Sequence, residues 1–161
     1  MVTIMDKISQ VLSYILYNYP YPDELSKTRC TKMIYLADWS SVLKYNKQIT
    51  DIEWYFGHYG PYVDDVYNIV KKSKSLFFIQ KSQSYFGNPK EIFRLNPDYA
   101  PETLLNNEEK QILDDIIEKT QYLNWNEFVK MVYETYPIES QKKYNHLNLI
   151  EIKRNMINKR N

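Results

Sequence analysis

The stretch MIYLADW, Met33 to Trp39, lies in the middle of a helical pattern that runs from residue 25 to 46. It is apolar on nearly every side, which is typical of a helix in the centre of a domain. Asp38 places a carboxylate inside this apolar run. A buried carboxylate costs several kcal/mol unless it is paired or hydrogen-bonded. The sequence therefore predicts a buried central helix in which Asp38 has hydrogen-bonding or charged partners.

Further helices are predicted on both sides of the central one. Residues 3 to 18 form an amphipathic pattern, and weaker patterns occur over residues 63 to 72 and 147 to 157. The apolar residues of the first pattern follow the spacing of one helix face: Ile4, Ile8, Val11, Leu12, Ile15 and Leu16. The central helix thus has amphipathic neighbours with which to bury its surface.

Capping signals define two more helices in the second half of the chain. Asn106 or Asn107 is a suitable N-cap for a fourth helix. Asn124, with Glu127 three residues later, resembles the capping box of a fifth. We expect Pro137 to close this fifth helix, which brings the predicted total to about six.

Short strands complete the predicted fold. Residues 52 to 56 are rich in aromatics, and the turn at 57 to 61 is expected to lead directly into a helix, with Gly supplying φ > 0 and Pro61 at the helix entry. Two apolar runs joined by FGNP predict a hairpin near residues 76 to 95. The expected fold is a single, mostly helical α+β domain over residues 1 to 161 with a small antiparallel sheet.

Aromatic residues are unusually frequent, at 16% of the chain, and 16 of them are tyrosines. Tyrosine joins a large apolar ring to a hydroxyl that needs a partner, so an excess suits half-buried surfaces and protein interfaces. The same excess also fits a compositional bias, because Asn, Ile and Lys are abundant as well. Composition alone leaves both explanations open.

Charge is balanced overall but uneven along the chain. The net charge of +1 gives no general reason to expect nucleic acid or an anionic membrane as a partner. Residues 142 to 161 nevertheless carry six Lys or Arg against one acid, and 148 to 161 are expected to form a basic, partly frayed C-terminal helix. An alternative function follows: a nucleic-acid-binding regulator, with the hairpin as a winged-helix-like reader and the basic end contacting phosphate.

The sequence contains no recognisable catalytic or metal-binding pattern. Cys30, His58 and His146 stand apart from one another, so no metal site and no cofactor are expected. Sequence separation does not exclude a Cys30 and His58 nucleophile pair, but a cysteine on an apolar helix usually packs as a small hydrophobe. We expect a non-enzymatic protein. The single cysteine and the lack of a signal-peptide or membrane-helix pattern indicate a cytoplasmic one.

Four motifs occur in a fixed order: TRCTKMIYLADW (28 to 39), QIT (48 to 50), EWYFGHYGPYV (53 to 63) and VYETYPIE (132 to 139). Together they closely resemble the SocA-like antitoxin domain, also called Panacea, which is found in phage-associated proteins related to GepA. The resemblance implies an antitoxin of a bacterial or prophage toxin-antitoxin pair that neutralises its toxin by direct protein contact. The toxin would be encoded by the adjacent gene. Delivery of the bound toxin to an AAA+ protease is a second mode that the resemblance implies.

The family signature falls on eight positions: Lys32, Tyr35, Asp38, Trp39, Trp54, Tyr59, Gly60 and Pro61. Relatives pair with unrelated toxins, so we expect most shared residues to build the scaffold: Lys32, Tyr35, Asp38, Trp39, Gly60 and Pro61. Aromatic anchors dominate many protein interfaces. For contact with a partner we therefore expect the turn residues Trp54, Tyr55, His58, Tyr59 and Tyr62, together with the hairpin near 76 to 95.

Overall fold

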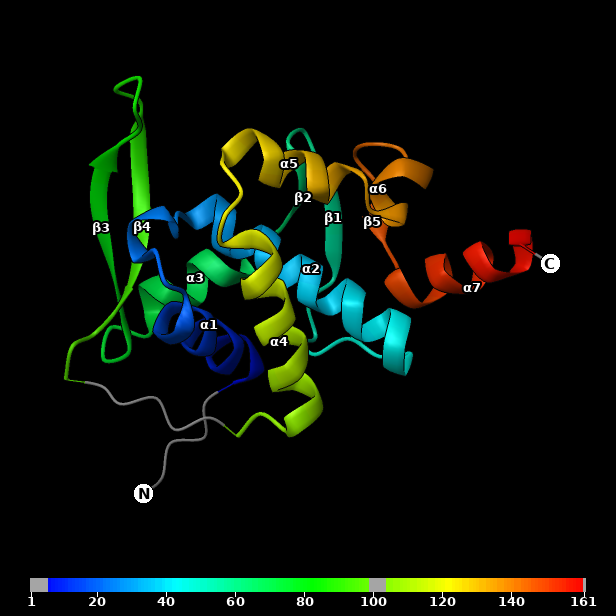
Figure 1. The fold of residues 1–161 in the computed structure, drawn as a ribbon, viewed down its shortest axis with the longest axis horizontal. Helices are drawn as coiled ribbons and strands as arrows, with labels where there is room; N and C mark the ends of the chain where they lie inside the picture. Colours follow the sequence, from blue (N-terminus) through cyan, green and yellow to red (C-terminus); the bar gives the residue numbers. More distant parts are fainter. Residues whose placement is uncertain (1–5, 99–103, 161) are drawn as a thin grey trace.

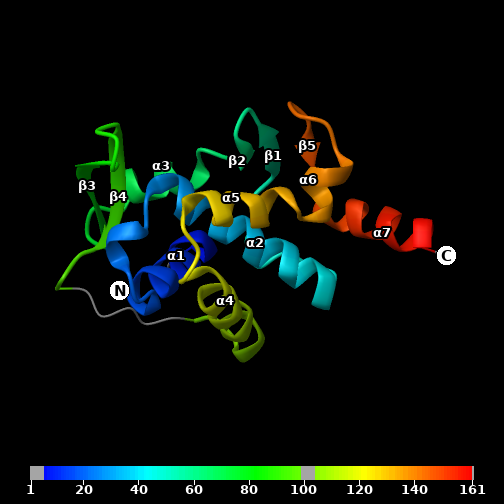
Figure 2. The same ribbon diagram turned by 45° about the horizontal axis from the view of Figure 1, so that its top comes forward.

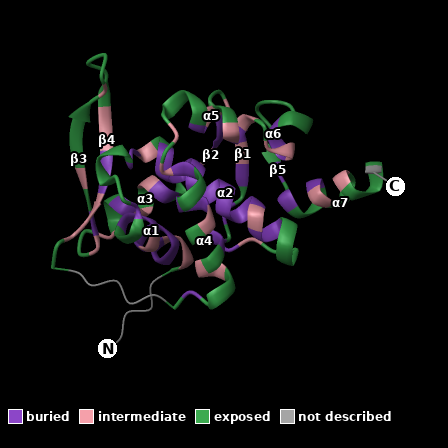
Figure 3. Cartoon of the chain, in the orientation of Figure 1, coloured by how far each residue is buried: buried purple, intermediate pink, exposed green. Residues whose placement is uncertain are grey.

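The computed structural model describes residues 6–98 and 104–160 and has helix α2, Lys27–Tyr45, at its centre (Figures 1 and 3). The Ser26 side chain caps its start by accepting from the Arg29 N–H, and Asn46 ends it in a left-handed conformation with φ 59°. Most of its side chains are buried, including the whole stretch from Met33 to Trp39. The predicted central helix is confirmed.

Six more α-helices and one 3-10 turn surround α2 in the described residues. They are α1 (Lys7–Asn18), η1 (Pro22–Glu24), α3 (Asp65–Lys72), α4 (Asn107–Thr120), α5 (Trp125–Tyr133), α6 (Tyr136–Ser140) and α7 (Leu149–Arg160). Helices α1 and α4 pack on each other and on α2, whereas α7 extends away from the rest of the domain (Figures 1 and 2). The predicted mostly helical α+β class is confirmed.

Local capping explains where several helices begin. Both predicted helix starts near Asn106 and Asn124 are confirmed as capping boxes, with Glu109 and Glu127 returning the second hydrogen bond. The first helix begins at Lys7, and the predicted residues 3 to 5 lie outside the described part of the chain.

The prediction that Pro137 closes the fifth helix is wrong. Helix α5 already ends at Tyr133, and Pro137 lies in the first turn of α6. Proline fits there because the first N–H groups of a helix have no intrahelical acceptor. The residue therefore starts a helix instead of ending one.

The strands form two small antiparallel sheets instead of one. The predicted hairpin is confirmed as β3 (Phe77–Gln83) paired with β4 (Pro89–Leu95). In the second sheet, β1 (Trp54–Gly57) lies between β2 (Gly60–Tyr62) and β5 (His146–Leu147). Strand β5 comes from a segment far along the chain, which is why the sequence pattern did not reveal it.

The predicted passage from the 57 to 61 turn directly into a helix is wrong. The chain first folds back as the β1–β2 hairpin, with Phe56 opposite Pro61, and α3 begins only at Asp65. Pro61 is buried in β2 and is not at a helix entry. The N–H and carbonyl of Phe56 bond to Asn145 and Tyr144, on the side away from β2, so Phe56 and Pro61 form a pair without ladder hydrogen bonds. The missing N–H of proline on this edge strand therefore breaks none.

Gly60 has φ +100°, and a Cβ at this position would lie 3.2 Å from Cε2 of Tyr133. Gly60→Ala is therefore expected to lower the free energy of unfolding by about 2 kcal/mol, from backbone strain and crowding together. Chemical denaturation with a two-state fit measures it. Gly87→Ala is the matched control for strain alone, because Gly87 has φ +81° with open space around it. Equal losses for the two variants would show that contact with Tyr133 contributes nothing.

The two hairpins share one side of the molecule. In both Figure 1 and Figure 2 the tips of β1–β2 and β3–β4, and the loop between α6 and β5, lie at the top. Residues that are far apart in the sequence can therefore form one continuous surface on this side.

Candidate functional site: a buried scaffold beneath an aromatic surface

Asp38 is fully buried and accepts hydrogen bonds from the loop that follows α2. Its Oδ1 accepts from the backbone N–H groups of Ile49 and Thr50, at 2.9 and 3.0 Å. Its Oδ2 accepts from the Thr50 hydroxyl at 2.5 Å, from Trp54 Nε1 at 2.8 Å and from Gln48 Nε2 at 3.3 Å. Three of the four sequence motifs thus meet at one carboxylate.

The electrostatics of Asp38 follow from this arrangement. Burial raises the pKa of its carboxyl to about 6, while the hydrogen bonds from Thr50, Trp54 and Ile49 act in the opposite direction. No ion pair to Asp38 exists among the described residues. The expectation that this carboxylate has partners is confirmed, and those partners are neutral donors.

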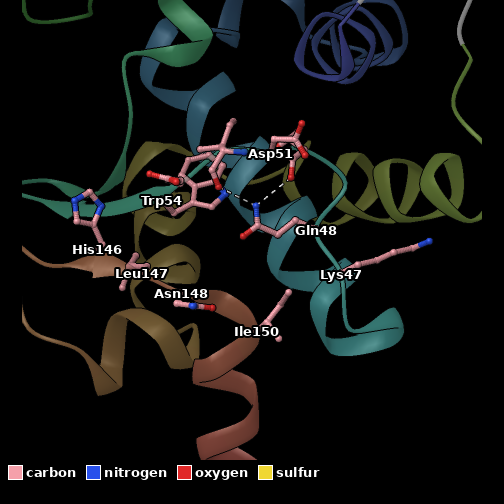
Figure 4. Close-up of a pocket in the computed structure, with 11 residues that line it drawn as sticks. Lys47, Gln48, Asp51, Trp54, His146, Leu147, Asn148 and Ile150 are labelled. Carbon is pink, nitrogen blue, oxygen red and sulfur yellow. Dashed lines mark hydrogen bonds between the residues drawn. The ribbon is translucent and has the colours of Figure 1, made fainter.

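A cavity of about 550 Å³ lies beside this loop, between residues 47 to 54, strand β5 and the start of α7. Gln48 donates to the carbonyl oxygens of Thr50 and Ile52, so it ties the loop together (Figure 4). Figure 4 shows Lys47 extending away from Trp54 and His146. Within the described residues no group of three or more His, Cys, Asp or Glu could hold a metal ion.

Lys32 is a second buried charge on α2, with only 2% of its surface exposed. Its Nζ donates one long hydrogen bond, 3.5 Å, to the carbonyl oxygen of Pro61. None of the ion pairs in the described part of the chain involves it. Burial lowers the pKa of this amine to about 8. Two signature residues, Lys32 and Pro61, therefore connect α2 to β2.

The other residues expected to build the scaffold are also buried. The Tyr35 hydroxyl lies 2.8 Å from the Thr135 hydroxyl, and its ring meets Trp54 edge-on with centroids 5.5 Å apart. Trp39 is 6% exposed. Gly60 lies against the Tyr133 ring. These contacts hold α2 against the β1–β2 hairpin and the α5–α6 region.

The five residues expected to contact a partner do not all reach the surface. Trp54 is fully buried, and its indole N–H donates to Asp38. The prediction that Trp54 lies on the contact surface is therefore wrong. Tyr55 and Tyr62 are half-buried. His58 is exposed, and Tyr59 is 77% exposed at the hairpin tip. Alternation of side chains along β1 separates the inward Trp54 from its neighbour.

Two residues that sequence reasoning did not select complete this surface. The Tyr144 hydroxyl lies 3.1 Å from Nδ1 of His58, which is 86 positions earlier. The ring of His146 meets that of Tyr55 at 5.3 Å. We call Tyr55, His58, Tyr59, Tyr144 and His146 the turn cluster. The aromatic turn motif pointed to Tyr55, His58 and Tyr59, whereas for Tyr144 the only sequence signal was the high tyrosine content.

Tyr144 has an uncommon backbone conformation, with φ 69°. Its N–H donates to the carbonyl oxygen of Phe56 at 2.6 Å, and its side chain is 61% exposed. A bulky residue in the left-handed region costs roughly 1–3 kcal/mol, and strained conformations of this kind are enriched at functional sites. The loop thus holds an exposed tyrosine beside the hairpin tip.

The residues considered for nucleophilic catalysis lie in different environments. Cys30 is fully buried in α2, with its thiol directed at the Leu25 carbonyl oxygen, and burial raises the pKa of this thiol. His58 lies in an exposed turn and pairs with Tyr144. No contact in the described residues joins Cys30 to His58, so the pair that catalysis requires is not formed.

The basic C-terminal segment has one structural role. Lys153 of α7 donates through Nζ to the carbonyl oxygens of Val42 and Leu43, at 3.1 and 3.0 Å, and to Oδ1 of Asn46 at 2.6 Å. A cation at this position satisfies the free carbonyls at the end of α2 and complements its dipole. One of the six basic residues therefore anchors α7 and is not free to bind phosphate.

None of the helices in the described residues has the length and apolar character needed to cross a lipid bilayer. A comparison with protein-family models matches residues 31–137 to the model described as antitoxin SocA-like, Panacea domain. Searches of curated proteins and of solved structures found no match. The matched span covers more than half of the chain and contains most of α2, both hairpins, α4 and α5. The chain therefore belongs to the antitoxin SocA-like, Panacea domain family.

Proposed function

We propose that this protein neutralises a cognate toxin by direct protein–protein binding, and that the turn cluster is the centre of the contact. Membership of the antitoxin family supports an antitoxin role in general. The observation that supports this surface in particular is the gathering of exposed aromatic rings from two distant segments at one hairpin tip. Binding alone, without catalysis or a cofactor, accounts for neutralisation.

The turn cluster has the physical properties of a preformed binding surface. Strand β1 pairs on both sides, with β2 and with β5, and two of its own side chains, Trp54 and Phe56, are buried in the core. Aromatic side chains on a rigid backbone lose little conformational entropy on binding and supply large contact areas. Tyrosine is among the residues that most often dominate interface energetics.

We propose occlusion of the toxin as the primary mode, with a toxin encoded by the adjacent gene as partner. Delivery to an AAA+ protease is a second mode that uses the same first contact. The two modes differ in cells that lack the protease: occlusion still rescues growth, whereas delivery does not. Direct regulation of nucleic acid, the alternative function, has support only from the basic C-terminal residues.

The test is co-expression with the product of the adjacent gene, followed by measurement of growth and of complex formation. The double variant Tyr59→Ala/Tyr144→Ala is expected to weaken the complex about 30-fold or more and to abolish rescue. Tyr17→Ala is the control, because Tyr17 is 68% exposed on α1, away from the turn cluster. Absence of both toxicity and a complex would refute the antitoxin role, and unchanged binding by the double variant would refute the surface.

A further inference from the structure

A second cavity, of about 790 Å³, lies between the start of α2, the start of α5 and the tip of the β3–β4 hairpin. We call it the hairpin groove. The residues in its lining that matter here are Lys27, Arg29, Tyr85, Phe86, Lys90 and Trp125.

One part of the hairpin groove is aromatic and exposed. Tyr85 is 97% exposed, Phe86 is 85% exposed and Trp125 is 45% exposed. The rings of Tyr85 and Phe86 stand edge-to-face at 5.3 Å, and thus form a single apolar wall. Exposed apolar residues that gather beside a cavity mark interaction sites in soluble proteins.

The other part of the hairpin groove contains a buried cation without a counterion. Arg29 is 3% exposed, and its Nη2 donates only to uncharged oxygens, those of Tyr19, Thr120 and Leu123. Its Nε has no hydrogen-bond partner within residues 6–98 and 104–160. Among the described residues no carboxylate forms an ion pair with it. The guanidinium also lies over the rings of Phe128 and Tyr19, 4.5 and 5.8 Å from their centroids, but neither ring carries a full negative charge. An incoming anion would therefore supply the missing counterion.

The backbone adds to the positive potential around Arg29. The N-cap residues of α2 and α5, Ser26 and Asn124, both line the hairpin groove, so two helix N-termini meet there. Helix N-termini attract anions. Lys27 and Lys90 line it as well, against Glu24 and Glu91. The result is a local positive region interrupted by acids.

We propose that the hairpin groove binds an extended acidic segment of the toxin. An apolar or aromatic side chain of the segment packs on Tyr85, Phe86 and Trp125, and a carboxylate reaches the end near Arg29. The apolar wall of Tyr85, Phe86 and Trp125 matches apolar side chains that alternate with carboxylates, whereas a continuous phosphate backbone offers it nothing to pack on, so a peptide is the better match. This inference rests on the proposed function and adds the chemistry of the partner.

The first test uses the full chain and two model peptides of equal length, one of Glu and Phe residues and one of Lys and Phe residues. Fluorescence anisotropy is expected to show at least about 10-fold tighter binding of the acidic peptide. The double variant Tyr85→Ser/Phe86→Ser is expected to weaken that binding about 10-fold or more. Phe78→Ser is the control, because Phe78 is 43% exposed on the same hairpin but does not line the hairpin groove.

Equal affinity for the two peptides, or binding that the double variant leaves unchanged, would overturn the proposal. Tighter binding of a random DNA duplex than of the acidic peptide, lost in Lys27→Glu/Lys90→Glu, would overturn it in favour of nucleic acid. The peptide result does not depend on toxin neutralisation. If the turn-cluster variant loses rescue while the Tyr85 and Phe86 variant keeps it, the hairpin-groove inference fails and the proposed function stands.

Discussion

Replacing Asp38 with alanine is expected to lower the free energy of unfolding by about 3–5 kcal/mol, the cost of breaking a buried, fully engaged charged group. The substitution removes the Asp38 oxygens that accept from the indole N–H of Trp54 and from the backbone N–H groups of Ile49 and Thr50. It also leaves a cavity in the centre of the domain. Native domains are stable by only about 5–15 kcal/mol, so this loss is a large share of the total.

Asp38→Asn separates hydrogen bonding from charge. The amide oxygen can keep the two backbone donors, and the Thr50 hydroxyl can rotate to accept from the new amide. The Trp54 N–H cannot reverse its polarity, so it loses its partner. The loss should therefore be smaller than for alanine, at about 2–3 kcal/mol. Equal losses for the two variants would show that the carboxylate oxygen that accepts from Trp54, and not the size of the side chain, sets the effect.

A comparison of the wild type with Asp38→Asn is expected to show how the stability depends on pH, and the sign of this dependence follows from the pKa of Asp38. The pKa of Asp38 is raised from 3.8 to about 6 in the folded state, so the folded protein binds this proton more tightly than the unfolded chain. Relative to Asp38→Asn, the wild type should lose stability as pH rises from about 4 to about 6 and then level off. Asp51→Ala, an exposed change in the same loop, is the control and should shift stability by less than about 0.5 kcal/mol.

Lys32→Met is expected to stabilise the protein at pH 7, by about 2–3 kcal/mol. The folded state holds this amine in a site that lowers its pKa from 10.5 to about 8, so the charged form is disfavoured there. Methionine has a similar shape without the charge, and among the described residues the substitution removes just the 3.5 Å hydrogen bond to Pro61. The unfavourable charge is thereby removed at little cost.

The pH profile of this variant identifies the cause. Between about pH 8 and pH 10.5 the unfolded chain binds the Lys32 proton more tightly than the folded protein, so wild-type stability should rise with pH relative to Lys32→Met. The difference between the two proteins should close across this range in urea denaturation series. Lys44→Met, an exposed change on the same helix, is the control. A Lys32→Met protein that is less stable at pH 7 would show that the amine contributes more through Pro61 than its burial costs.

Local patterns predicted most of the helices. The cap residues Asn106 and Asn124 act through atoms within three positions of themselves, so their effect can be read directly from the sequence. The burial of α2 follows from its composition, and the hydrogen bonding of Asp38 follows from the cost of burying a charge. The prediction for Pro137 was wrong because proline can start a helix as well as end one, and the next helix was too short to recognise.

The surface expected to contact a partner was only partly predictable. The sequence selects an aromatic turn, but strand geometry turns Trp54 inwards to Asp38 and leaves Tyr59 outside. The hairpin tip at Tyr85 and Phe86 lies inside the predicted 76 to 95 hairpin. Its position beside the buried Arg29 depends on how that hairpin packs against η1 and α2.

The amino-acid sequence alone establishes the central helix, the family and a buried carboxylate that needs donors, because each depends on neighbouring residues or on an ordered set of motifs. The packed domain determines which donors reach Asp38 and which rings meet at the surface. Tyr144 and His58 are 86 positions apart, and they touch because β5 joins the edge of β1. Such contacts depend on how the whole chain buries its apolar surface, and no local pattern encodes that arrangement.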